Sequence, residues 1–468
     1  MAREAWPSRF ARRCADWAER WFPDAYVFAA LAVVVVAVVA LAFGASPRET
    51  AGAFGKGYWS LIPFTMQMVF VVIGGYVLAS APVVSRAIDA LARIPRTGRG
   101  AVAFVATLSM LTSLLSWGFS LVFAGLLVRA LARRDALQMD YRAAGAAAYL
   151  GLGAVWAMGL SSSAAQLQAN PASMPPALLA ITGVLPFSQT IFLWQSIALT
   201  TVLIAVSVAI AWWTAPTGDA VRGAPAETPP PAPTARSARR PGDWLETTPL
   251  LTIALSLLAF GWLASEFTSR PFTAAIADLN TYNLLFLSLG LLLHWRPRSF
   301  LDAVGKAVPG TAGVLIQFPL YGGIAAMLTG AAGADGTTLA HRLSDLFVQV
   351  ANRDTFALVM GTYSAVLGFF VPSGGGKWLI EAPYVMQAAN DLRFHLGWAV
   401  QVYNAAEALP NLVNPFWMLP LLGVLGLRAK DIVGYTFVQL LVHVPLVLGL
   451  LWLLGATLAY VPPVIPAA

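Results

Sequence analysis

The stretch VPSGGGKWLIEAP, residues 371–383, follows the apolar run LVMGTYSAVLGFF (358–370) and interrupts it. Three consecutive glycines weaken a helix, because glycine loses more backbone freedom on folding than any other residue. Lys377 and Glu381 also bring charge into sequence that is otherwise apolar. What this interruption means depends on the solvent around it, which the composition of the whole chain indicates.

The composition is that of a protein surrounded by lipid. Of 468 residues, 58% are hydrophobic and 11% are charged, and the mean hydropathy is +0.70. A soluble domain carries about 25% charged residues, so this chain could not cover its own surface in water. Several apolar runs reach the roughly 20 residues that a spanning helix needs. We therefore predict an all-α, polytopic membrane protein. Arginines in loops beside the spans explain the net charge of +7 without a nucleic-acid partner.

The composition also argues against some kinds of site. Cys14 is the only cysteine, so no disulfide or thiolate cluster can form within one chain. The four histidines are scattered without ligand spacing, so we expect no zinc site and no resident cofactor.

The apolar run at 25–44 is too long for a typical signal peptide, and no clear small-residue cleavage site follows it. This run is predicted to be a retained first span behind a basic, amphipathic N-terminal segment.

The apolar runs predict nine spans and two shorter excursions into the membrane. The stretches 101–131 and 354–389 would be roughly 46 and 54 Å long as single helices, against a hydrocarbon core of about 30 Å. Each is interrupted near its middle, by SWG (116–118) and by PSGGGKW (372–378), so we predict two re-entrant hairpins. The spans are predicted near 25–44, 58–80, 142–188 (broken), 189–214, 244–265, 281–296, 308–330, 394–428 (broken) and 430–460.

The arginines predict the orientation of the chain. Most of them lie in segments that fall on one side if the N-terminus is cytoplasmic, as the positive-inside rule requires. The segment 215–243, rich in proline and polar residues, lies on that side and is predicted to be a solvated, largely disordered linker. We therefore expect a multi-pass protein of a bacterial-type inner (plasma) membrane, with a cytoplasmic N-terminus and a periplasmic C-terminus.

The same order of elements occurs twice. The spans at 58–80 and 308–330 are each followed by an amphipathic segment, a hairpin, a broken span and an intact span. Five predicted crossings separate the two starts, and an odd number gives the copies opposite orientation. Inverted repeats with paired broken helices are typical of secondary transporters, which hold substrate near mid-membrane. The predicted units are the N-terminal segment with the first span (1–57), a first repeat (58–214), the linker (215–243), two connecting spans (244–307) and a second, inverted repeat (308–468).

Pseudo-symmetry predicts that four interruptions converge: SLLSWG (113–118), GLSSSAA (159–165), SGGGKW (373–378) and NAAEALPN (404–411). Half-helix N-termini favour an anion such as a carboxylate, and open carbonyls favour a cation such as Na⁺. The candidate substrate-binding residues are Ser116, Trp117, Gly118, Ser161, Ser162, Ser163, Ser373, Gly374, Gly375, Gly376, Lys377, Trp378, Asn404 and Asn411.

Several candidates also have a structural interpretation. The serines at 161–163 could be small residues at a helix contact, and Trp117 and Trp378 could be packing residues or interfacial anchors. Lys377 and Glu381 stand four apart and would pair on a continuous helix. Pro383 argues that regular helix begins nearer 381, which weakens that pairing.

Lys377, a cation within an apolar run, is a candidate partner for an anion such as a carboxylate. Moving a monovalent anion inward against 100 mV costs roughly 2.3 kcal/mol, so accumulation of such an anion would require a co-transported cation. Glu381 and Glu407 are the candidate proton carriers, and we favour Glu407 because it has no nearby countercharge in the sequence. Neutral oxygens at 161–163 and 404–411 offer the alternative of a Na⁺ site.

Five stretches carry a resemblance to a known family. They are WPSRFARRCADWAERWFPDAYVFA (6–29), FTMQMVFVVIGGYVLA (64–79), SWGFSLVFAGLLVRALAR (116–133), VPSGGGKWLIEAPYVMQAA (371–389) and LPNLVNPFWMLPLLGVLGLRAKDIVGY (409–435). Together they resemble the short-chain fatty acid transporter family of the ion transporter superfamily, over nearly the whole chain except the linker. The resemblance implies an inverted-repeat homodimer with a scaffold and an elevator-type transport domain. It also implies small monocarboxylate substrates such as butyrate or acetoacetate. Neither hairpin tip has the Ser-Asn-Thr triplet of the superfamily's sodium–carboxylate members.

The predicted function is secondary active transport of a short-chain carboxylate by cation symport, with the lipid bilayer and the substrate as partners. Transport of another small organic anion, such as a dicarboxylate or an amino-acid derivative, stays open, as does a passive carboxylate channel. A channel would need a continuous polar pore, whereas this chain offers isolated breaks. An intramembrane enzyme would need a nucleophile–base or metal pair, and no Ser–His or His–Glu helical spacing provides one.

Overall fold

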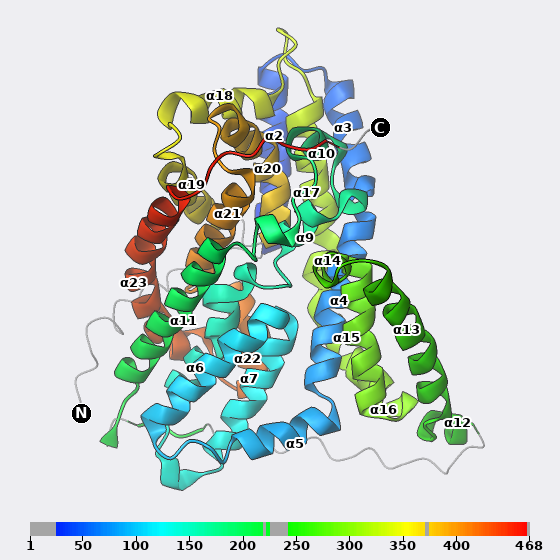
Figure 1. The fold of residues 1–468 in the computed structure, drawn as a ribbon, viewed down its shortest axis with the longest axis vertical. Coiled ribbons are helices and arrows are strands. Elements are labelled where there is room, and N and C mark those ends of the chain that lie inside the picture. The colour runs from blue at the N-terminus through cyan, green and yellow to red at the C-terminus, as the bar shows by residue number, and fades with distance from the viewer. Residues whose placement is uncertain (1–24, 219–220, 225–241, 370–373, 466–468) are drawn as a thin grey trace.

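The computed structural model describes residues 25–218, 221–224, 242–369 and 374–465. Across these ranges the chain forms helices and loops, with one isolated β-bridge between Ala332 and Thr338. Figure 1 shows an elongated bundle in which helices from both halves of the sequence pack together. The predicted N-terminal amphipathic segment, most of the linker and Ser373 lie outside the described residues.

Seven helical segments in these ranges are long and apolar enough to cross a membrane. They are Ile62–Ala79, Gly98–Leu115, Tyr141–Ala169, Trp194–Thr214, Leu250–Ser269, Pro297–Gly330 and Ala429–Gly455. Four shorter apolar helices are Ala29–Ala42, Trp117–Ala132, Leu279–His294 and Phe356–Gly368. The prediction of an all-helical, multi-pass membrane protein is confirmed.

The first described helices are α2 (Ala25–Ala42), α3 (Pro47–Ser60), α4 (Ile62–Ala79) and the short amphipathic α5 (Pro82–Leu91). Hydropathy does not reveal α3 as a separate helix, because Arg48, Glu49 and Lys56 make it polar. Its start nevertheless has a sequence signal. Ser46 accepts a hydrogen bond from the N–H of Glu49, and the Glu49 carboxylate accepts one in return, with Pro47 in the first turn.

The first predicted hairpin is broken where the SWG motif lies. The helices α6 (Gly98–Leu115) and α7 (Trp117–Ala132) pack side by side, and one extended residue, Ser116, separates them. The Ser116 hydroxyl accepts a hydrogen bond from the N–H of Phe119 and so caps the N-terminus of α7. The break is confirmed, whereas entry and exit at the same membrane face stays a prediction.

The first broken span is interrupted over a longer stretch. Helix α8 (Tyr141–Leu150) continues as one π-helical turn, Gly151–Val155, and then as a 3₁₀ turn, Trp156–Met158. A non-helical segment, 159–162, follows. The chain then forms α9 (Ser163–Ala169), α10 (Pro176–Thr182) and the intact α11 (Trp194–Thr214). Single π-turns inside helices frequently lie at functional sites, and this one leads into the serine cluster.

Two groups of helices complete the chain. The connecting group comprises α12 (Asp243–Thr247), α13 (Leu250–Ser269), α14 (Phe272–Ala277), α15 (Leu279–His294) and α16 (Pro297–Ala307). The second half comprises α17 (Ala312–Gly330), α18 (Leu339–Val350), α19 (Phe356–Gly368), α20 (Gly374–Asp391), α21 (Leu396–Asn411), α22 (Pro415–Leu425) and α23 (Ala429–Gly455).

Helix pairs that pack in the first half have counterparts in the second. Helix α4 packs on α7 as α17 packs on α20, and α6 packs on α8 as α19 packs on α21. Likewise α6 contacts α11, and α19 contacts α23. The inverted relation of the two halves stays a prediction.

Two predictions about the second half are wrong in detail. The glycines at 374–376, with Lys377 and Trp378, form the first turns of α20 and not a helix break. The stretch 404–411 is also helical, and the second broken span is interrupted just after it, at 412–414. In both places tertiary packing keeps a sequence helical although glycine or proline disfavours helix.

Candidate functional site

The two interruptions of the first half lie against each other. The N–H of Leu160 donates to the carbonyl of Leu114 at 2.7 Å, and the N–H of Trp117 donates to the Ser161 hydroxyl at 3.1 Å. A side-chain carbon at Gly159 would overlap the backbone of Leu114, so this approach requires glycine. The bonds satisfy backbone groups that the two breaks leave without helical partners.

A polar contact joins the first half to the second. The Ser162 hydroxyl donates to Oδ1 of Asn404 at 3.1 Å, and Nδ2 of Asn404 donates to Oε1 of Gln401 at 3.4 Å. All three side chains are buried. The serine cluster and the stretch 404–411 therefore meet, as the sequence predicts.

The glycines of α20 allow it to approach this region closely. A side-chain carbon at Gly374 would overlap the indole ring of Trp156. One at Gly375 would lie 3.0 Å from Cβ of Ser163 and 3.3 Å from the ring of Phe318. The need for glycine here thus comes from helix contact, not from a backbone conformation that only glycine adopts, since none of 374–376 has a positive φ.

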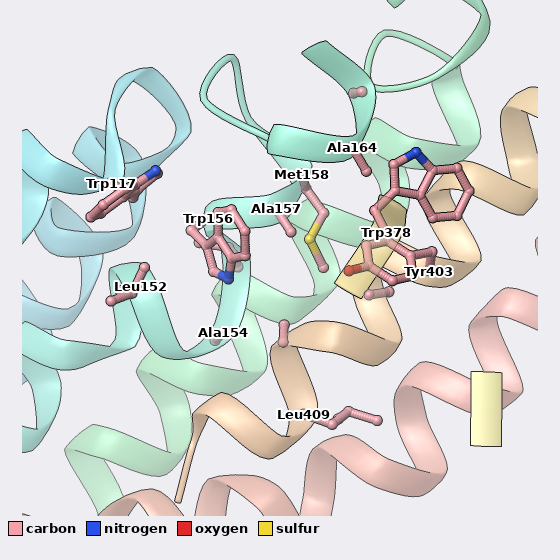
Figure 2. Close-up of a cluster of buried hydrophobic side chains, with 14 of the residues drawn as sticks. Trp117, Leu152, Ala154, Trp156, Ala157, Met158, Ala164, Trp378, Tyr403 and Leu409 are labelled. Carbon is pink, nitrogen blue, oxygen red and sulfur yellow. The ribbon is translucent and has the colours of Figure 1, made fainter. Parts of the chain in front are cut away.

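Aromatic side chains line the contact between α20 and α21. Figure 2 shows Trp378 above Tyr403, with Trp156 and Met158 on the neighbouring segment. The rings of Trp378 and Tyr403 lie 4.6 Å apart between centroids, and the Tyr403 hydroxyl donates to the carbonyl of Gly374. In the described part of the chain, the buried indole N–H groups of Trp117, Trp156 and Trp378 have no hydrogen-bond acceptor. These donors suit a polar ligand, because a buried N–H without a partner is costly.

Three charged side chains meet where α20 contacts α21. The ammonium nitrogen Nζ of Lys377 lies 3.2 Å from Oε1 of Glu381 and 2.7 Å from Oε2 of Glu407. It also donates to the carbonyl and hydroxyl of Ser364 on α19, at 2.8 and 2.7 Å, and lies 4.6 Å from the ring centre of Tyr403. We call Lys377, Glu381 and Glu407 the charge triad. Their side chains are 0% exposed.

The charge triad corrects two interpretations of the sequence. Helix α20 begins at Gly374 and continues through Pro383, so Lys377 and Glu381 share one face of it and pair. Glu407, which has no nearby countercharge in the sequence, has one in space. Residue spacing could not show this second pairing, because only the fold brings α20 and α21 together.

The ionisation of the charge triad determines what it can bind. One lysine and two glutamates give +1 − 2 = −1 when all three are ionised. Among the described residues, no group donates a hydrogen bond to Oε1 of Glu407. Buried charge without full compensation is unfavourable, so one proton shared by the two glutamates would make the triad neutral. The geometry suits reversible binding of a proton and exchange of one carboxylate for another.

The remaining candidates lie around this centre, and their roles stay predictions. Asn411 ends α21, and its carbonyl accepts a hydrogen bond from the Tyr149 hydroxyl at 2.8 Å. The Ser163 hydroxyl lies 3.6 Å from Sδ of Met68 on α4. Gly118 packs against the backbone of α4, and Gly376 is buried in the first turn of α20.

Sequence reasoning missed several polar residues of the region. Ser364 and Gln401 contact the candidates directly. Gln166 is buried, and its amide has no hydrogen-bond partner among the described residues. Each is a polar residue inside an apolar run, so a search for isolated amides and hydroxyls within spans would have found them. No group of three or more His, Cys, Asp or Glu side chains that could hold a metal ion occurs in the ranges searched.

Two proteins that are similar to this chain over nearly its whole length carry a functional name. Two proteins called "Putative short-chain fatty acid transporter" come from Escherichia coli (strain K12) and Haemophilus influenzae (strain ATCC 51907 / DSM 11121 / KW20 / Rd). They are 33% identical over 462 residues and 30% identical over 457 residues. The matches cover 96% and 95% of this chain, and 99% and 100% of the relatives.

Two solved transporters share the fold. The YdaH transporter of Alcanivorax borkumensis superposes with a TM-score of 0.59 at 16% identity, over 93% of this chain and 98% of that one. MtrF of Neisseria gonorrhoeae superposes with a TM-score of 0.58 at 13% identity, over 98% of this chain and 99% of that one. At these identities the likeness concerns the fold alone.

The model of the family described as "Short chain fatty acid transporter" matches residues 7–454. With the two relatives, this match shows that the chain belongs to the short-chain fatty acid transporter family.

Proposed function

We propose that this chain carries short-chain monocarboxylates across a membrane together with protons. Family membership supports a short-chain carboxylate as substrate, and acetoacetate and butyrate are the compounds we would test first. The proposal that transport is active and proton-coupled rests on the charge triad.

The observation that carries this proposal is the 2.7 Å contact between Lys377 and Glu407 inside a triad of net charge −1. A proton on Glu407 cancels the excess charge and weakens the hold of Glu407 on the ammonium group. The substrate carboxylate then takes its place at Lys377 in a charge-assisted contact. Binding of the anion alone would raise the net charge of the triad and substrate to −2, whereas the anion bound with one proton keeps it at −1. A bound proton therefore favours binding of the carboxylate.

Glu407, not Glu381, is the proposed proton carrier. Glu381 lies on the same helix as Lys377, so their contact persists in any rigid movement of α20. Glu407 reaches the ammonium group from α21, so its protonation changes the contact between two helices. Only the contact between Glu407 and Lys377 can therefore couple protonation to a movement of α20 relative to α21.

Neutral groups near the charge triad are proposed to hold the rest of the substrate. The hydroxyl of Ser162 and the amide of Asn404 already pair across the two halves. The buried rings of Trp378 and Tyr403, with centroids 4.6 Å apart, are the proposed apolar contacts of the short alkyl chain. A longer or doubly charged acid would bring apolar surface or charge that these groups do not complement, which disfavours the dicarboxylate alternative.

Family membership and the charge distribution support a proposal for the assembly and orientation. We propose a homodimer in a bacterial inner membrane, in which one part of each subunit moves as an elevator-type transport domain. The N-terminus is placed in the cytoplasm, because most arginines then lie inside.

Uptake of labelled acetoacetate into proteoliposomes tests the coupling. With acid outside and no sodium, we expect accumulation well above that in protein-free liposomes, which corrects for diffusion of the neutral acid. Glu407→Gln should exchange labelled for unlabelled substrate but not accumulate it. Glu246→Gln is the matched control, because the Glu246 side chain is 45% exposed and pairs with exposed Arg298. Sodium-driven uptake at equal pH, or proton-driven accumulation by Glu407→Gln, would overturn the coupling.

A further inference from the structure

A groove of about 600 Å³ lies between α6 and α11 on the outside of the helix bundle. On α11, Ala205, Ala209, Trp212 and Trp213 recur at helical spacing and so share one face, and Ala103 faces them from α6. The small side chains of the alanines create the groove, and the two exposed tryptophans border it. All the side chains that line it are apolar or aromatic.

Arg99 lies at one end of this groove. It stands four residues before Ala103 on α6, and its guanidinium carbon lies 5.3 Å from the ring centre of Trp212. Its Nε group donates to the carbonyl of Ala215, just after α11, at 3.1 Å. These contacts fix the guanidinium group in place. In the described ranges no carboxylate pairs with Arg99, so its two Nη groups remain for a ligand.

The same end of the α6–α7 pair is rich in positive charge. Arg93, Arg96 and Arg133 are exposed there, against the exposed Asp89 and Asp135. Arg99 and Arg134 lie there too, and the guanidinium group of Arg134 donates to the carbonyls of Ala92 and Pro95. Together these residues make five positive and two negative side chains. This excess predicts an anionic partner.

We propose that an anionic phospholipid occupies the groove, with one acyl chain along the alanines and its phosphate on Arg99. A guanidinium group binds phosphate through two parallel N–H donors. Tryptophans at the interface mark the depth at which headgroups lie, and basic pockets beside spans bind anionic headgroups. A soluble anion would match Arg99 but not the apolar groove, and a neutral phospholipid would match the groove but not the charge. This site is separate from the charge triad and does not depend on the coupling mechanism.

Native mass spectrometry of the purified full chain tests this, with phosphatidylglycerol and phosphatidylcholine titrated at equal concentration. We expect wild type to retain phosphatidylglycerol about tenfold better. Arg99→Gln should lose that preference while retaining phosphatidylcholine unchanged. Ala209→Phe, which fills the groove and leaves Arg99 in place, should lower retention of both lipids. The controls are Arg353→Gln, an exposed arginine that also donates to a backbone carbonyl, and Ala264→Phe, an exposed alanine on α13; both should behave as wild type.

Three results would overturn the proposal. The first is equal retention of the two lipids by wild type, or no effect of Arg99→Gln. The second is thermal stabilisation by glycerol phosphate equal to that by phosphatidylglycerol, which would indicate a simple anion site. The third is a change from dimer to monomer in Ala209→Phe with lipid retention unaltered, which would make the groove a surface between copies of the chain.

Discussion

At Lys377, one ammonium group faces two carboxylates, a carbonyl and a hydroxyl, all inside the protein. Its removal would leave Glu381 and Glu407 buried together without a countercharge, and breaking a buried ion pair costs about 3–5 kcal/mol. We therefore expect Lys377→Met to unfold at a lower temperature in detergent. The double variant Lys377→Met, Glu407→Gln should recover part of the lost stability, because only Glu381 then lacks its countercharge, but not substrate uptake.

The control for this prediction is Lys306→Met, because Lys306 is exposed near the end of α16. Thermal unfolding measures the effect of each variant on stability, and uptake into proteoliposomes measures its effect on transport. If Lys377→Met is as stable as wild type, the three groups do not act as one charge network.

A second residue tests which carboxylate gives uptake its pH dependence. In the loop between α17 and α18, the hydroxyl and N–H of Thr337, together with Arg342, lower the pKa of Asp335 to about 2. A carboxyl with a lowered pKa contributes stability above its unfolded pKa and loses it only as pH falls toward 2, so Asp335 keeps one charge between pH 5 and 8. Asp335→Asn should leave the pH profile of uptake unchanged across that range, whereas Glu407→Gln should flatten it. A shifted profile in Asp335→Asn would assign part of the coupling to this loop.

At the scale of elements, the contact of α20 with the serine cluster depends on missing side chains. A side chain at Gly375 would press on Ser163 and Phe318, whereas Gly449 of α23 has no atom within 4 Å. Both glycines lie in helices, where valine has a higher propensity than glycine, so packing and not helix propensity makes the difference. We expect Gly375→Val to lower acetoacetate uptake by at least about tenfold, and Gly449→Val to keep most of it. Equal uptake by the two variants would mean that this close contact is not needed.

Particular elements show how far the sequence predicts this fold. The break at Ser116 is predictable, because a polar, glycine-containing motif divides an apolar run too long for one crossing. Helix α3 is missed by hydropathy although its capping box is present in the sequence. Pro410 lies inside α21 but near its end, so it does not break the helix earlier. The pairing of Lys377 with Glu407 joins residues on different helices, and no local pattern encodes such a contact.

At the scale of the whole molecule, the two halves meet at the proposed site. Ser162 contacts Asn404 across the halves, and α20 packs on α9 and α17. The charge triad lies within the second half, so binding there changes charge beside this contact. In the proposed mechanism, this proximity links the charge of the triad to helix contact, as movement of a proton and an anion in one step requires.

If one proton accompanies each carboxylate, accumulation of the substrate should not depend on the membrane potential. Acetoacetate accumulation is measured in proteoliposomes at a fixed pH gradient, without sodium, while potassium and valinomycin set the potential to zero or to 100 mV negative inside. A one-to-one symport of a proton and a monocarboxylate moves no net charge, so we expect equal accumulation at both potentials. Movement of the anion alone would be opposed by roughly 2.3 kcal/mol, about a 50-fold loss. Such a loss, or a gain at the negative potential that reveals additional cations, would rule out one-to-one symport of a proton and a monocarboxylate.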